Sequence, residues 1–72
     1  MESNMYITSQ TLKIIRDNIK NKKYIKDTGT LKVSFSEYLE IIMKLKEIQK
    51  EDPDNKDLEK ALFDMEKGMK KY

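Results

Sequence analysis

The feature that most constrains the fold is a change of hydrophobic period between Thr30 and Lys50. Apolar residues first alternate with polar ones, as in a strand with one buried face, and then recur every three or four positions, as in an amphipathic helix. The alternating residues are Leu31, Val33 and Phe35, and the helical ones are Tyr38, Ile41, Ile42, Leu45 and Ile48. Ser36 lies between them and suits a helix cap. This stretch predicts a strand that ends at Phe35 and a helix over residues 37–51.

A helix is also predicted before this stretch, over residues 8–22. Thr8 or Ser9 can cap it, and Leu12, Ile15 and Ile19 form one apolar face. Residues 1–7, which precede it, are expected to be a flexible N-terminus.

A last helix is predicted over residues 56–70. Pro53 ends the preceding helix, because proline disfavours helical geometry in the residue before it. Asp54 or Asn55 can cap the new helix, and Gly68 weakens its last turn. Its apolar stripe comprises Leu58, Ala61, Leu62, Met65 and Met69.

Residues 23–35 allow two arrangements. Tyr24 and Ile25 favour a strand and the following residues favour a turn, so the segment can form a β-hairpin within one chain. Alternatively, Leu31 to Phe35 is a single strand that pairs with a second copy. The predicted fold is one small domain over residues 1–72, mainly α with a short β element: helix, β-hairpin or single ribbon strand, then two helices.

The small size of the chain predicts a homodimer. A domain of this length buries only about 60% of the surface of its unfolded chain, so its core is marginal. The sequence has no Cys and no His, which excludes a disulfide and leaves no credible ligand set for a structural zinc ion. Self-association is the remaining common source of stability.

The residue types present argue against catalysis. Without Cys or His, the serines have no identifiable base, and the two glycines are too far apart for a phosphate-binding loop. The acidic turn at Asp52 and Asp54 lacks the glycine and the closing glutamate of a calcium loop. We therefore expect a non-enzymatic protein without a cofactor or a metal.

Positive charge is concentrated in the middle of the chain. Residues 13–32 carry seven basic and two acidic side chains, a net charge of +5, whereas the whole chain has +2. Such a segment favours a polyanion or an acidic partner. No apolar run approaches the roughly 18 residues of a membrane span, and no targeting signal is visible, so a cytoplasmic protein without membrane contact is expected.

The order of a strand, an apolar helix, a polar turn and a second amphipathic helix over residues 30–72 resembles the ribbon-helix-helix DNA-binding proteins of the CopG and Arc type. The resemblance implies that strands of two chains pair into a ribbon that lies in the major groove. It further implies that backbone amides near Asn55 and Lys56 bind phosphate. By position, the ribbon would read bases through Thr30, Lys32 and Ser34, and the basic segment adds Lys20, Lys22, Lys23 and Lys26 as contacts to DNA.

Two functions follow from these observations. The first is a dimeric DNA-binding transcriptional regulator or a phage or plasmid accessory factor. The second is an inhibitor or adaptor, encoded by a phage or mobile element, that binds a host or phage protein through its apolar helical face. The residues expected at such a protein interface are Tyr38, Ile42, Leu45, Phe63, Met65 and Tyr72.

Overall fold

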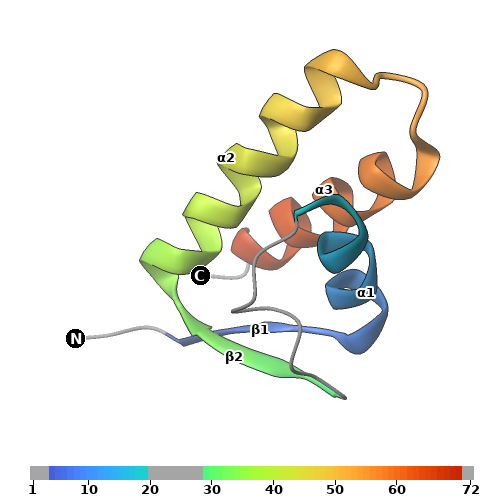
Figure 1. The fold of residues 1–72 in the computed structure, drawn as a ribbon. Coiled ribbons are helices and arrows are strands. Elements are labelled where there is room, and N and C mark those ends of the chain that lie inside the picture. Colours follow the sequence, from blue (N-terminus) through green and yellow to red (C-terminus); the bar gives the residue numbers. More distant parts are fainter. Residues whose placement is uncertain (1–3, 20–28, 71–72) are drawn as a thin grey trace.

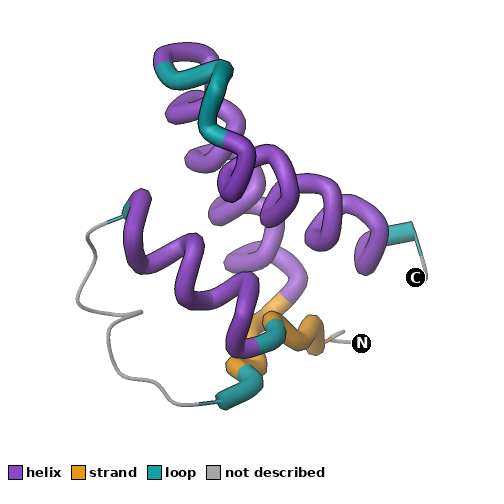
Figure 2. Tube along the Cα trace, turned by 90° about the vertical axis from the view of Figure 1, so that its right-hand side faces the viewer, coloured by secondary structure: helices purple, strands orange, loops and turns teal. Residues whose placement is uncertain are grey.

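The computed structural model describes residues 4–19 and 29–70. Five elements follow one another in these residues: β1 (Asn4–Ile7), α1 (Ser9–Asn18), β2 (Leu31–Ser34), α2 (Phe35–Glu51) and α3 (Lys56–Met69). The two strands lie side by side at one end of the molecule, and the helices lie on one side of them (Figures 1 and 2). The predicted fold class, mainly helical with a short β element, is confirmed.

The N-terminal region differs from the prediction, because residues 4–7 form a strand instead of a flexible segment. β1 pairs antiparallel with β2, and Met5 faces Val33 across the pair. The sequence pattern was too short to indicate this strand: only Met5 and Ile7 alternate with their neighbours, although both are almost fully buried. The ribbon is therefore made within one chain. The alternative partner of the strand, residues 23–27, lies outside the described residues.

The first helix is shorter than predicted. The Thr8 hydroxyl accepts a hydrogen bond from the Thr11 backbone amide at 3.4 Å, so α1 begins at Ser9. It ends at Asn18, because Ile19 has an extended backbone. Its expected apolar face is confirmed, since Leu12 and Ile15 are buried together with Ile19.

The second helix begins two residues earlier than predicted, and its cap is Ser34 rather than Ser36. The Ser34 hydroxyl accepts from the Glu37 amide at 3.2 Å and donates to the Glu37 carboxylate at 3.4 Å. A serine followed three residues later by glutamate is the sequence signature of a capping box, which the sequence analysis missed. Phe35 is consequently the first residue of α2 and is 39% exposed, whereas the strand pattern predicted that it would face the core.

The third helix begins where it was predicted, with Asn55 as its cap. The Asn55 side-chain oxygen accepts from the Leu58 amide at 3.1 Å. The side-chain nitrogen of Asn55 donates to Asp52 at 3.1 Å and to Asn18, at the end of α1, at 3.3 Å. One side chain therefore joins the α2–α3 turn to the first helix.

The core lies between the strands and the three helices. α2 contacts α1, α3 and both strands, and its Leu45 is completely buried. The Tyr38 hydroxyl donates to the Met65 carbonyl oxygen at 2.8 Å and lies against Gly68. A Cβ atom at Gly68 would lie 2.8 Å from that hydroxyl oxygen. Gly68 thus permits close packing of α2 on α3, rather than only weakening the last turn as the sequence predicted.

Candidate nucleic-acid interface

The candidate interface is the outward face of the two-stranded ribbon. Successive side chains of a strand point to opposite faces, so the register divides the ribbon into two sets. The inward set packs on the core and comprises Met5, Ile7, Leu31 and Val33. The outward set comprises Asn4, Tyr6, Lys32 and Ser34. We refer to these four residues as the ribbon face.

Tyr6 and Lys32 lie directly opposite each other at the centre of the ribbon face. Directly opposed residues in an antiparallel pair have Cβ atoms about 4.5–5.5 Å apart, so an aromatic ring and a cation share one small surface. Tyr6 is 59% exposed, and Lys32 is also exposed. The pair offers an apolar ring, a hydroxyl and an ammonium group to a partner.

The structure separates the residues predicted to bind nucleic acid into three groups. Thr30 and Lys32 are exposed at β2, where the prediction requires them. Ser34 is half-buried and its hydroxyl caps α2, so this side chain has a structural role, and its predicted base contact stays a prediction. The basic residues of the third group lie outside the described residues: Lys20, Lys22, Lys23 and Lys26.

The start of α3 does not belong to this interface. The resemblance to ribbon-helix-helix proteins implied that amides near Asn55 and Lys56 would bind phosphate beside the ribbon. The α2–α3 turn instead lies at the end of the molecule opposite the strands (Figures 1 and 2). The acidic side chains of this turn, including Asp52 and Asp54, are therefore also remote from the ribbon face.

Sequence reasoning missed the contribution of β1 to this surface. Asn4 and Tyr6 lie in the segment that was expected to be flexible, and they now supply half of the ribbon face. The available signal was the alternation of exposed and apolar residues from Asn4 to Ile7. Four residues fit a short strand, but they are too few to distinguish it from chance.

Most residues predicted to form a protein interface belong to the core of the single chain. Burial is nearly complete for Tyr38, Ile42, Leu45 and Met65, so these side chains do not form a docking surface of the folded protein. The wide apolar face of α2 is explained by contacts within the chain, because this helix packs on four other elements. Phe63 is 66% exposed and fits the prediction, whereas Tyr72 lies outside the described residues.

One apolar stripe of α2 remains uncovered. Phe35, Leu39 and Met43 recur every four residues and therefore lie on one side of the helix. Phe35 is 39% exposed, Met43 is 66% exposed, and Leu39 is half-buried between them. We refer to these three residues as the α2 stripe.

The described parts of the chain contain neither a cluster of metal-ligating side chains nor a membrane-spanning helix. Across residues 4–19 and 29–70, His, Cys, Asp and Glu side chains nowhere gather in a group of three that could hold a metal ion. In the same residues, no helix combines the length and the apolar character that crossing a bilayer requires. Comparison of the chain with protein-family models, with curated proteins and with solved structures finds no match.

Proposed function

We propose that this protein is a small, non-enzymatic DNA-binding regulator that inserts its ribbon face into the major groove. The observation that carries the proposal is the pairing of Tyr6 with Lys32 on an exposed face whose opposite side is fixed to the core. The major groove admits a two-stranded β-ribbon. The partner strand comes from the same chain, so the ribbon does not depend on a second copy.

The chemistry of the ribbon face suits base reading. The Lys32 ammonium can donate to guanine O6 and N7, and the Asn4 amide can pair with adenine N6 and N7. The Tyr6 ring can contact a thymine methyl group, while its hydroxyl can reach a phosphate. The side chains of Tyr6 and Lys32 form no hydrogen bond or ion pair with another described residue, so DNA would not have to displace an internal partner.

A binding series tests the proposal. Fluorescence anisotropy should detect binding of the full chain to a pool of random duplexes at low salt, with an affinity that falls as salt rises. Lys32→Ala should either reduce the salt slope by about one or, where it removes a base contact, cost about 1–3 kcal/mol and relax sequence preference.

The matched control is Lys56→Ala, because Lys56 is an exposed lysine at the start of α3, at the opposite end of the molecule. Its loss should leave DNA affinity nearly unchanged. Absence of binding to any duplex at low salt would refute the proposal, as would equal losses from the two lysine variants.

A second candidate, self-association, is favoured by the α2 stripe. A second copy that packs antiparallel on this stripe, with Leu39 at the symmetry axis, would place Phe35 of each copy against Met43 of the other. The apolar side chains that are exposed in the single chain would then cover one another.

Sedimentation equilibrium distinguishes this candidate. Met43→Asp should shift a concentration-dependent dimer to monomer, because it places a charge in the apolar contact, against Phe35 of the other copy. Phe63→Asp is the matched control, since Phe63 is equally exposed but belongs to α3. A mass of 8.6 kDa at every concentration would exclude the dimer.

A further inference from the structure

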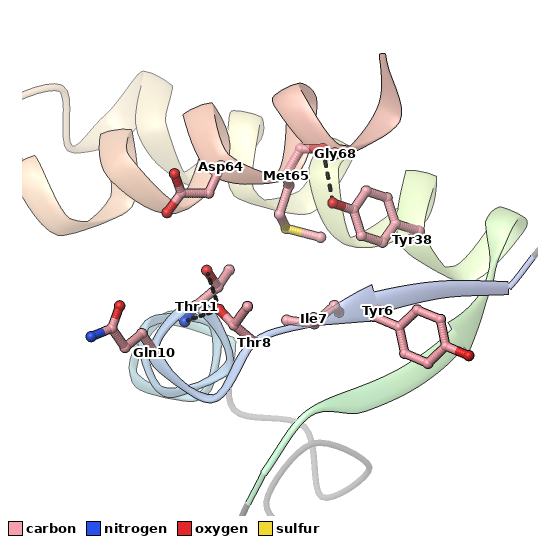
Figure 3. A pocket seen from close by; sticks show the side chains of 9 residues that line it. All are labelled: Tyr6, Ile7, Thr8, Gln10, Thr11, Tyr38, Asp64, Met65 and Gly68. Atoms are coloured by element: carbon pink, nitrogen blue, oxygen red, sulfur yellow. Dashed lines mark hydrogen bonds between the residues drawn. The ribbon is translucent and has the colours of Figure 1, made fainter. Parts of the chain in front are cut away.

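A cavity of about 320 Å³ lies between the start of α1, the end of β1 and the middle of α3. Figure 3 shows its walls: Asp64 extends from α3 toward Gln10 and Thr11 on the other side, while Met65 on α3 and Ile7 on β1 lie beside them, further along the cavity. The two apolar side chains are almost completely buried, and Asp64 is exposed. The cavity thus has an apolar floor and a polar rim.

The charge at the rim is negative. The nine residues that line the cavity include one carboxylate, Asp64, and no lysine or arginine, although the whole chain carries 15 basic residues. The Asp64 side chain forms no hydrogen bond or ion pair with another described residue. The N-terminus of α1 opposes this charge with only roughly half a positive charge. A cation is therefore favoured at the rim, and an anion is not.

The other polar groups around the rim can accept hydrogen bonds. The Gln10 side chain offers an amide oxygen, and hydroxyls come from Thr8 and Thr11. Thr11 is only 4% exposed, and its hydroxyl accepts from the Thr8 hydroxyl at 3.2 Å, which fixes the orientation of this wall. Such acceptors match an ammonium group, which has three donors and no acceptor.

We propose that this cavity binds an alkyl-ammonium group, with the alkyl chain against Ile7 and Met65 and the ammonium at Asp64. The volume is at the lower end of the range for ligand sites, which suits a single flexible chain rather than a ring system. The group can come from a lysine side chain of a partner or from a small free amine. The cavity shares Tyr6 with the ribbon face, but the proposal does not rest on DNA binding, because the ammonium is placed at Asp64 of α3.

Titration of the isotope-labelled full chain by NMR tests the site. The probe is n-pentylammonium, and 1-pentanol serves as a neutral ligand of similar shape. We expect saturable shifts of the Gln10, Thr11 and Asp64 amides with the amine, weaker binding at high salt, and much weaker binding of the alcohol. Equal binding of the amine and the alcohol would overturn the proposal, as would the absence of any saturable shift.

A pair of variants tests whether the Asp64 carboxylate binds the ammonium group. Asp64→Asn should weaken n-pentylammonium binding about tenfold, because it removes a charge-assisted hydrogen bond but keeps the side-chain shape. Asp57→Asn should have no effect, since Asp57 is also exposed on α3 but does not line the cavity. Retained affinity in Asp64→Asn, with a circular dichroism spectrum like that of the parent, would refute the assignment.

The two sources of the ammonium are distinguished by repeating the titration with blocked lysine, a lysine whose α-amino and α-carboxyl groups are both capped. Tighter binding of blocked lysine than of n-pentylammonium supports a partner's side chain. Equal affinities support a free amine. A blocked lysine that is excluded while the free amine binds also supports the free amine, because the backbone then clashes with the rim.

Discussion

The two ends of the molecule are both polar, but they use their polar side chains differently. At the α2–α3 turn, Asn55 caps α3 and donates to Asp52 and to Asn18 of α1. At the ribbon end, the side chains of Tyr6 and Lys32 make no hydrogen bond or ion pair with other described residues. Polar groups that satisfy one another contribute to the fold, whereas exposed groups without internal partners remain available to a ligand.

Composition alone does not identify a binding surface in this chain. The turn contains two acidic residues, Asp52 and Asp54, and the family resemblance implied a phosphate site beside them, yet the Asn55 side chain connects helices there. The ribbon face contains two residues from a segment that carried almost no sequence signal. The two ends differ in whether their polar side chains form hydrogen bonds within the folded chain.

The largest effect on stability is expected in the core, which joins the two ends. Leu45 is completely buried in α2, so Leu45→Ala should reduce the free energy of unfolding by about 2–5 kcal/mol. Chemical denaturation measured by circular dichroism gives this value. Both ends should unfold together in one transition, because they share one core. Separate unfolding transitions for the ribbon and the turn would show that the two ends do not share one core.

A smaller effect on stability is expected at the contact between α2 and α3. Gly68→Ala places a Cβ 2.8 Å from the Tyr38 hydroxyl oxygen, and the overpacking should cost about 1–3 kcal/mol despite the better helix propensity of alanine.

A double-mutant cycle measures this contact directly. In a Tyr38→Phe background the oxygen is absent, so Gly68→Ala should become neutral or stabilising. An identical cost of Gly68→Ala in both backgrounds would show that the hydroxyl is not responsible.

At the turn end, Asn55→Ala should lower the free energy of unfolding by about 1 kcal/mol, because it removes the helix cap. The loss should be larger than for Asn18→Ala, since Asn18 provides only one of the contacts of Asn55. DNA affinity, measured in the same buffer, should stay unchanged in both variants. A fall in affinity at equal stability would place the turn in the interface.

The smallest effect on stability is expected at the ribbon end. The double variant Tyr6→Thr with Lys32→Gln keeps strand-compatible side chains on an exposed face, so the free energy of unfolding should change by less than about 0.5 kcal/mol. DNA binding should nevertheless be lost. A large loss of stability would mean that the ribbon face serves the fold, as the turn does.

The helices were largely predictable because their apolar residues repeat over many positions. The stripe from Leu58 to Met69 predicted α3 and its cap, and burial follows that stripe closely. The start of α2 was also encoded locally by Ser34 and Glu37, but the strand pattern extended to Phe35 and hid the cap. The strand pattern and the capping pattern overlap at Ser34 and Phe35, so the boundary between β2 and α2 could not be placed from the sequence alone.

The ribbon was not predictable to the same degree. Its strands are four residues each, and the pairing of β1 with β2 joins segments separated by a whole helix. Sequence periodicity carries no information about such a partner. The same limit explains why Lys32 was identified as a candidate while Tyr6, directly opposite, was not. The burial of Tyr38 also depended on contacts with α3 that no local pattern specifies.

The most direct test of the proposed function is an NMR footprint of DNA on the isotope-labelled full chain. A duplex selected for tight binding is added at low salt, and amide shifts are recorded for every assigned residue. We predict that the largest shifts occur at Asn4, Tyr6 and Lys32, while the turn from Asp52 to Asn55 is unaffected. Shifts at the turn without shifts on the ribbon face, or no shifts with any duplex, would contradict the account.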